Sequence, residues 1–397
     1  MTPMLDIAAE VLDGVTVLEL GNFITGPYAG LLLADLGADV IKIERPEGDP
    51  FRSFRNGSYS PNFVGFNRNK RSVRLDLTTQ EGHDAFLRLV ETADVLIENF
   101  RPGVMQKLGI DYETLKVWRP SLVYCAIAGF VPGSERGDDP AFDTIGQALS
   151  GMLSVFLDPS KPEIRGPTIS DQLAGMYACY GVLGALIGRN KTGLGRRVDV
   201  NMIEATASFM PDFFASVSRE GTLMAPTTRA SYSQSFAVIA QDGGMIGIQL
   251  SSPEKFWRSL LVAIKAPELA SDPRFARRVD RIAHFDELGK ELAERFKTRP
   301  QAYWLEALQQ ADVPHAPIKT VDEVLADPEL IRAESFHTMH HPQMGEVIGI
   351  SRPVLYDAQR SPSRYPPPML GEHTEQVLRD AGLTPSEILA VGGLPNK

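Results

Sequence analysis

The first half of the chain alternates short apolar runs with longer amphipathic ones. Residues 15–20 (VTVLEL) and 39–44 (DVIKIE) have the nearly continuous apolar character of buried strands, and 28–37 (YAGLLLADLG) has helical spacing and ends at a glycine. This order predicts a strand–helix–strand unit with a loop at 21–27. The alternation continues with strand-like runs at 72–77, 94–100 and 121–130 and a helix-like run at 79–93. Such a rhythm favours a mostly parallel sheet flanked by helices, with ligands beyond the carboxyl ends of the strands.

The pattern changes after a long apolar helix within 166–190 and a glycine-punctuated turn near residue 193. A polar, turn-rich connector at 224–234 precedes a hairpin over 235–250 with an Asp-Gly turn. We expect a helix to begin near Pro253 and charged helices to follow to about residue 330. Short strands return at 346–357. The predicted organisation is a large domain over 1–220, a smaller α+β domain over 221–330 and a C-terminal segment over 331–397.

Composition narrows the class of protein. The 397 residues are 43% hydrophobic and 23% charged, and 40 Lys plus Arg against 50 Asp plus Glu give a net charge of −10. This balance argues against a general nucleic-acid or membrane-surface binder. The two cysteines, Cys125 and Cys179, fall in apolar runs and indicate packing groups in a reducing compartment. With no signal pattern and no apolar run long enough to span a bilayer, we expect a cytoplasmic protein.

Several common site patterns are missing or incomplete. Gly21, Gly26 and Gly30 are spaced five and four apart, which departs from the G-x-G-x-x-G pattern of dinucleotide sites, although Glu44 stands where a ribose hydroxyl is often bound. The histidines show no metal-ligand spacing and no G-x-S-x-G turn occurs. These observations argue against a dinucleotide enzyme, a metal centre and an α/β-hydrolase.

Two candidate features remain. Asp171 is the only formal charge in its apolar helix until Arg189, and a carboxylate in a first turn is usually a helix cap. Cations follow or precede several predicted strands and are each most simply surface charges, although together they are suited to a polyphosphate. They are Arg45, Arg68, Lys70, Arg71, Arg101 and Lys107, with Asn99 and Phe100 beside them.

Six segments in the same order resemble the family III CoA-transferases, the CaiB/BaiF group that includes formyl-CoA transferase. They are GVTVLELGNFITGPYAGLLLADLGADVIKIERPEGDPFR, NRNKRSVRLDL, DVLIENFRPGVMQKLGIDYETL, TISDQLAGMYA, KTGLGRRVDVNMIEA and PPPMLGEHTEQVL. The resemblance covers residues 13 to 380, nearly the whole chain. It implies a Rossmann-like large domain, a smaller domain and an interlocked homodimer in which each subunit threads through a ring made by the other.

The resemblance also implies chemistry. Members transfer coenzyme A from an acyl-CoA to a free carboxylic acid through one aspartate nucleophile, which matches Asp171 here. CoA would enter as a substrate, with no permanently bound cofactor. A helix N-terminus would keep the nucleophile ionised, and its backbone N–H groups would stabilise oxyanions. The matched CoA contacts are Asn22, Phe23, Ile24, Thr25, Arg45, Lys70, Asn99, Phe100, Lys107 and Leu108.

Two alternatives stay open at this point. α-Methylacyl-CoA racemases have the same fold and carry a histidine base in a G-H-D-x-N-Y segment, where this chain has Phe142 in AFDTIGQ. A phenyl ring accepts no proton, which disfavours racemisation. A CoA-binding protein without turnover is the other alternative. Two further departures from some transferases are Ile24 in place of a glutamine and only Gly243 and Gly244 in place of a long glycine-rich lid, so the acceptor acid is not identified.

Overall fold

The computed structural model describes residues 10–55, 57, 59–221, 225–251, 254–360 and 362–392. The chain forms two compact units. Unit 1 contains the chain up to Leu153, Ile164–Phe214 and the residues from Ala333 onward, and unit 2 contains Ser154–Glu163 and Ala215–Arg332. The chain therefore leaves unit 1 twice and returns to it twice.

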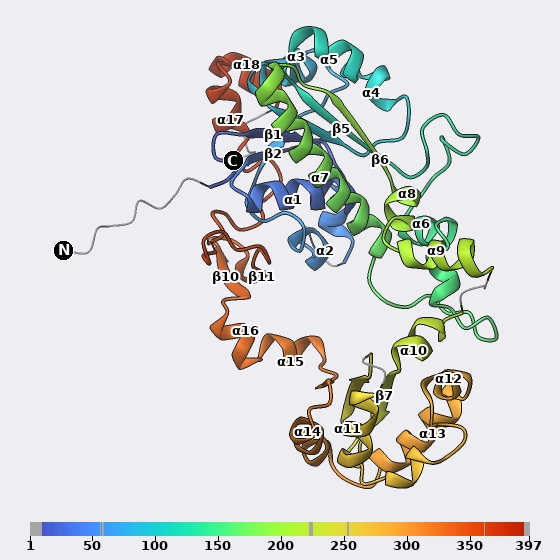
Figure 1. The fold of residues 1–397 in the computed structure, drawn as a ribbon. Coiled ribbons are helices and arrows are strands. Elements are labelled where there is room, and N and C mark those ends of the chain that lie inside the picture. Colours follow the sequence, from blue (N-terminus) through green and yellow to red (C-terminus); the bar gives the residue numbers. More distant parts are fainter. Residues whose placement is uncertain are drawn as a thin grey trace. The chain divides into compact units, whose positions relative to one another are not determined.

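A six-stranded parallel sheet forms the centre of unit 1 (Figure 1). Its strand order is β3-β2-β1-β4-β5-β6, so the direction of winding reverses between β1 and β4. This is the Rossmann-like order, and the parallel α/β sheet predicted from the sequence is confirmed. The strands are β1 (Thr16–Glu19), β2 (Asp39–Glu44), β3 (Lys70–Arg74), β4 (Val95–Glu98), β5 (Val123–Ala128) and β6 (Arg197–Asn201).

Alternate residues of these strands enter two separate cores. Val17 and Val95 pack under α1 (Thr25–Asp35) and α7 (Ile169–Thr192) on one face, whereas Leu18 and Leu96 belong to the core on the other face. The alternation follows from the two-residue period of a strand. Both cysteines lie buried and unpaired in the first of these cores. The second core is covered by α3 (Gln80–Thr92), α5 (Tyr112–Trp118), α17 (Thr374–Asp380) and α18 (Pro385–Ala390).

One strand boundary differs from the prediction, and several short elements complete unit 1. The predicted strand at 72–77 is instead β3, which begins two residues earlier and includes Lys70 and Arg71. Unit 1 also contains a β10–β11 hairpin near its C-terminal end (Figure 1). The remaining elements are η1 (Pro50–Ser53), α2 (Pro61–Val64), α4 (Val104–Lys107), α6 (Asp143–Leu149), α8 (Met202–Ala207), β10 (Phe336–His341) and β11 (Gly345–Ile350); η2 (Met152–Val155) and α9 (Pro211–Glu220) contain boundaries between the units.

Unit 2 is built around a three-stranded antiparallel sheet with the order β7-β8-β9. The predicted hairpin is confirmed as β7 (Ser235–Ile239) and β8 (Met245–Gln249), and Phe236, Ile246 and Trp257 enter one apolar core. The start expected near Pro253 lies outside the described residues. The other elements are α10 (Thr228–Ser233), inside the predicted connector, α11 (Lys255–Ala263), η3 (Pro267–Ala270), α12 (Arg278–Ala283), α13 (Phe285–Phe296), α14 (Gln301–Gln310), β9 (His315–Pro317), α15 (Val321–Leu325) and α16 (Pro328–Arg332).

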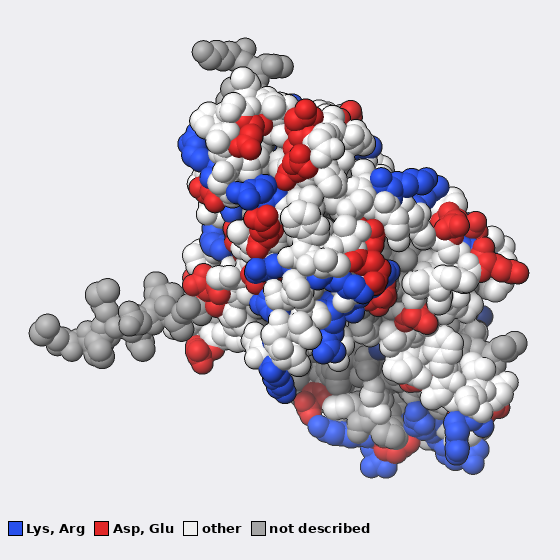
Figure 2. Space-filling model, turned by 90° about the horizontal axis from the view of Figure 1, so that it is seen from above, with Lys and Arg blue, Asp and Glu red and all other residues white. Residues whose placement is uncertain are grey.

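Over the described ranges, no helix combines the length and the apolarity needed to cross a bilayer. Acidic and basic side chains are interspersed on the face shown in Figure 2.

A buried group of charges holds the loop between β1 and α1. Lys42 of β2 and Lys70 of β3 have no exposed side-chain surface, and their ammonium groups pair with the two carboxylate oxygens of Glu19 at 2.9 and 2.7 Å. Lys42 also donates to the carbonyl of Gly21 at 2.7 Å, and Lys70 donates to that of Pro27 at 2.7 Å. The start of the loop and the first turn of α1, which follows it, are thereby bound to the sheet.

The same group of charges reaches the middle of the loop. Lys42 pairs with the buried Asp49 at 2.9 Å, and Asp49 Oδ1 accepts from the backbone N–H of Phe23 at 3.2 Å. Burial by itself would raise the pKa of Glu19, but Lys42 and Lys70 hold it below its ordinary value. A Cβ on Gly30 of α1 would lie 2.1 Å from the Glu19 carboxylate, so only glycine allows the helix to pass there. We call Glu19, Lys42, Asp49 and Lys70 the buried charge cluster.

The predicted CoA contact Lys70 lies inside this cluster. Its third partner is Asn67, whose Oδ1 accepts at 2.9 Å, so the three donors of the ammonium each face a protein oxygen. Burial lowers the pKa of Lys70 to about 8, and the side chain remains largely charged at neutral pH. Lys70 thus supports the loop from inside the protein, with no exposed side-chain surface.

We expect Lys70→Met to lower the free energy of unfolding by about 3–5 kcal/mol, because it leaves the buried Glu19 short of one counter-charge. Urea unfolding followed by circular dichroism measures the change. Lys107→Met, at an exposed position, is the control and should stay within about 0.5 kcal/mol of the parent. Equal effects of the two substitutions would show that the cluster does not stabilise unit 1.

Candidate functional site

A cavity of about 290 Å³ opens in unit 1 beyond the carboxyl ends of β1, β4 and β5. This is the switch point of the sheet, where parallel α/β folds usually bind ligands. Its walls come from the loops after those strands, the approach to α6 and the first turns of α7 and α8. The lining residues are Asn22, Phe23, Ile24, Thr25, Asn99, Phe100, Arg101, Pro102, Ile127, Ala128, Gly129, Gly137, Asp139, Pro140, Ala141, Phe142, Asp171 and Met202.

Asn99 joins two walls of this cavity. Its side-chain oxygen accepts from the N–H of Asn22 at 2.9 Å, and its amide nitrogen donates to the carbonyl of Asn22 and to the hydroxyl of Thr25, both at 2.8 Å. The β4 loop thus fixes the β1 loop in position. Of the ten residues assigned to CoA from the sequence, the cavity brings together Asn22, Phe23, Ile24, Thr25, Asn99 and Phe100, and it places them with Asp171.

The other predicted contacts lie outside this cavity. Arg45 is exposed, and its Nε donates to the carbonyl of Gly48 at 3.1 Å. Lys107 is exposed at the end of α4, whereas the half-buried Leu108 packs against the core under α3 and α5. Lys70 belongs to the buried charge cluster, as described above.

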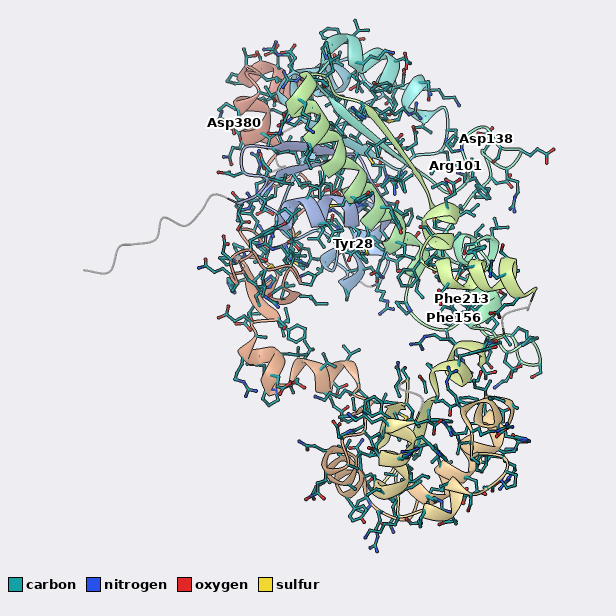
Figure 3. The ribbon with its side chains drawn as sticks, viewed as in Figure 1. Tyr28, Arg101, Asp138, Phe156, Phe213 and Asp380 are labelled. Carbon is teal, nitrogen blue, oxygen red and sulfur yellow. The ribbon has the colours of Figure 1, made fainter. Side chains whose placement is uncertain are left out.

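The cations considered as a single polyphosphate pocket do not come together. Arg68 pairs with Asp35, and Arg71 pairs with Asp39. Arg101 alone of the six lines the cavity, and it projects from the segment between β4 and α4 (Figure 3). Glu44 binds no ribose either, because it is buried and accepts from both Nε and Nη2 of Arg52 at 2.7 Å.

Asp171 is the third residue of α7, and its position depends on close helix packing. A Cβ on Gly175, one turn further along, would lie 2.8 Å from the carbonyl of Thr25. The glycine therefore lets the first turns of α7 approach the loop that lines the cavity. The capping role considered for Asp171 falls to another residue, since the side chain of Asp143 binds the start of this helix.

Asp143 caps α7 from the neighbouring helix α6. Its Oδ1 accepts from the backbone N–H groups of Ser170 at 2.8 Å and Asp171 at 3.2 Å, and its Oδ2 accepts from Gln147 at 2.6 Å. Sequence reasoning missed this residue because it lies 28 positions before Asp171. Thr168 at the N-cap makes no side-chain cap hydrogen bond, although threonine is a favoured N-cap residue, so the sequence contains no local sign of a cap from another helix.

The state of Asp171 differs from the sequence-based expectation. Burial, and secondly the negative charge of Asp143, raise its pKa to about 7. The two first-turn N–H groups that were expected to stabilise an oxyanion already donate to Asp143. The helix N-terminus therefore does not keep this carboxylate ionised at all pH values, and near neutrality the carboxyl group is poised between its acid and its base form.

Phe142 also lines the cavity, directly before Asp143. The position that carries the base in racemases therefore lies in the same site as Asp171, and here it holds a side chain that cannot transfer a proton. Through the described parts of the chain, no cluster of three or more histidine, cysteine, aspartate or glutamate side chains has a metal-binding arrangement. The site thus contains one carboxyl group with a raised pKa, Asp171. Asn22 and Asn99 supply polar groups to the cavity wall, and Phe23 and Phe142 supply apolar ones.

Known proteins are similar to this chain in sequence and in fold. The family model for CoA-transferase family III matches residues 12–374. Succinyl-CoA–D-citramalate CoA-transferase of Chloroflexus aurantiacus is 33% identical over 385 residues, covering 95% of this chain and 96% of the relative. Acetyl-CoA:oxalate CoA-transferase of Acetobacter aceti is 37% identical over 324 residues, covering 80% and 83%. The crystal structure of a CAIB/BAIF family protein from Brucella suis has a TM-score of 0.83 at 30% identity, covering 94% of this chain and 100% of that one.

We expect Asp143→Asn to lower the pKa of Asp171 from about 7 toward its ordinary value, because the substitution removes the like charge and keeps an oxygen to cap α7. Infrared difference spectroscopy across pH, with the carboxylate band assigned through Asp171→Asn, measures the midpoint. Asp139→Asn, which also removes a charge from the cavity wall, is the matched control and should not move it. An unchanged or raised midpoint in Asp143→Asn would contradict the electrostatic assignment.

Proposed function

Because the chain belongs to CoA-transferase family III, we propose that this transferase moves CoA from an acyl-CoA to a free carboxylic acid, with Asp171 as the nucleophile. The observation that carries the proposal is the position of Asp171 in one cavity with the loop residues that the family resemblance assigns to CoA. The relatives from Chloroflexus and Acetobacter are named as CoA-transferases acting on citramalate and oxalate, which supports the reaction class without identifying the acids used here.

The reaction exchanges acyl bonds without a net proton transfer. A carboxylate oxygen of Asp171 attacks the thioester carbonyl of the donor, the carbon–sulfur bond breaks, and CoA thiolate leaves a mixed anhydride. The thiolate attacks the aspartyl carbonyl of that anhydride, expels the donor acid as its carboxylate, and forms an aspartyl-CoA thioester. The acceptor carboxylate attacks this thioester and again displaces CoA thiolate. Attack of the thiolate on the acceptor carbonyl of the second anhydride yields the new acyl-CoA and restores the Asp171 carboxylate.

The environment of Asp171 suits these steps. Only the ionised carboxylate is a nucleophile, and a pKa of about 7 leaves it partly ionised at neutral pH. An anhydride hydrolyses in water, so the bound substrates are proposed to fill the cavity around Asp171 during the reaction. Because the pKa is raised, the ionised fraction falls as the pH drops below 7. The apolar body of α7 behind the carboxylate explains why a lone acid stands at the head of an otherwise uncharged helix.

CoA is proposed to bind as a substrate along the cavity wall. The loop residues Asn22–Thr25 and the pair Asn99 and Phe100 border the route to Asp171. Arg45, Lys107 and Leu108 are proposed to contact the nucleotide end, and the exposed charges of the two cations suit its phosphates. Lys70 is proposed to act on this binding through the loop that it holds.

A homodimer is proposed as the working form, in the cytoplasm. Met176, Tyr180 and Ile187 of α7 are exposed, Tyr180 to 74%, although they lie on the longest apolar helix of unit 1. Their spacing of four and seven residues places them along one side of the helix. A second copy of the chain, interlocked as the family resemblance implies, would cover them.

We expect Asp171→Ala to lower CoA transfer by at least about a thousandfold, because no other group replaces the acylated side chain. Transfer is measured as exchange of isotope between acyl-CoA and free acid, and the CoA dissociation constant, measured by calorimetry, should change by only a few fold. Asp139→Ala is the control for removal of another cavity carboxylate and should retain turnover. Retained turnover in Asp171→Ala would reject the proposed nucleophile.

Arg45→Ala should raise the KM for an acyl-CoA more than the KM for the corresponding acyl-pantetheine, because pantetheine lacks the nucleotide phosphates that Arg45 is proposed to contact. Steady-state kinetics with both thioesters measures the two ratios. Arg88→Ala, at an exposed arginine of α3, is the control. Equal losses with the two thioesters would remove Arg45 from the phosphate site.

A further inference from the structure

Two phenylalanine rings form one wall of the cavity that contains Asp171. Phe23 and Phe142 pack edge to face with ring centroids 5.8 Å apart, and both line the cavity. Phe142 is 62% exposed, so most of its ring remains available to a bound molecule. On its other side Phe23 packs edge to face on Phe51 at 5.3 Å. We call Phe23 and Phe142 the aromatic wall.

The fold holds Phe23 in an unfavourable backbone conformation. Its φ is +61°, in the left-handed region that bulky side chains rarely adopt. The N–H of Phe23 is held by Asp49 at 3.2 Å, and Asp49 is paired with the buried Lys42. The buried charge cluster thus positions an aromatic ring against its local preference, which is typical of residues that serve a site.

The charges around Asp171 have the wrong sign for a second carboxylate. Asp143 is the charged group that acts on Asp171, and Asp139 also lines the cavity. Among the described residues that line it, Arg101 is the only cation. The amide of Asn99 is already occupied by Asn22 and Thr25. Ile24, where some transferases carry glutamine, is buried with Phe51 and Phe63 and presents no polar atom of its side chain.

We propose that the aromatic wall binds the acyl group of an apolar monocarboxylic acid, so that this chain is a transferase for aliphatic or aromatic acids. The inference rests on the proposed function, since it names the substrate class of that same site. An acyl group bonded to Asp171 lies beside the rings, where burial of its methylene groups stabilises the complex. A second carboxylate at the same place loses hydration beside Asp139 and Asp143, with Arg101 as the one cation among the described lining residues to offset them, which disfavours a dicarboxylic acid.

Self-exchange of isotope tests the substrate class without knowledge of the physiological donor. The purified full-length protein is incubated with valeryl-CoA and labelled valerate, and separately with glutaryl-CoA and labelled glutarate. The two acids have equal chain length and differ in the second carboxylate. We expect kcat/KM for valerate exchange to exceed that for glutarate by about tenfold or more. A phenylpropionate pair examines aromatic acids in the same way and should also exceed glutarate.

Substitutions in the aromatic wall test its role. Phe142→Ala should lower the valerate-to-glutarate ratio by about tenfold, whereas Phe142→Leu, which keeps an apolar side chain, should largely preserve it. Trp118→Ala removes an exposed aromatic ring that does not line the cavity and should leave the ratio unchanged. Circular dichroism confirms that each variant is folded before its ratio is used.

The outcomes separate this inference from the proposed function. Exchange of glutarate that equals or exceeds exchange of valerate would overturn the substrate class and leave the transferase intact. A ratio that is the same in Phe142→Ala and in the parent would overturn the role of the aromatic wall. Absence of exchange with every acid tested would overturn the proposed function, and the inference would fall with it.

Discussion

The site depends on the pairing of two buried lysines with one buried glutamate. Lys42 and Lys70 lie on neighbouring strands, and Glu19 on the next strand bonds both through its two oxygens. Burying such charges costs several kcal/mol each unless they are paired, so the cluster is stable only when all its members are in place. The same ammonium groups fix the position of the loop between β1 and α1, because they bind the carbonyl of Gly21 at its start and that of Pro27 in the first turn of α1.

A series of contacts links the loop held by the buried charge cluster to Asp171. The fixed loop presents Asn22 and Thr25 to Asn99, which joins the first wall of the cavity to the second. The close approach of α7 at Gly175 then sets Asp171 against the same loop. Asp143 completes the arrangement by capping α7 and, through its charge, by raising the pKa of Asp171. The buried charge cluster therefore fixes the loop, and burial together with Asp143 raises the pKa of Asp171. Both features border the same cavity.

The sequence predicted the fold well and the site in part. Apolar runs at 15–20 and 39–44 identified strands, since a buried parallel strand is apolar on both faces, and the ordered motifs identified the family, which the match over residues 12–374 confirms. The burial of Lys70 was not predicted, because a buried, paired lysine is indistinguishable in sequence from a surface charge. Asp143 was missed because a cap contributed by another helix has no fixed spacing, and the pKa of Asp171 depends on burial that only the folded chain reveals.

The central claim is that Asp171 becomes covalently acylated and thioesterified during turnover. Mass analysis of the peptide containing Asp171, after incubation with acyl-CoA and reduction by borohydride, tests this claim most directly, because borohydride reduces an aspartyl thioester to homoserine with release of CoA. The account predicts homoserine at position 171 when acyl-CoA is present and unmodified aspartate when free CoA replaces it. Product formation with an unmodified aspartate throughout would contradict it.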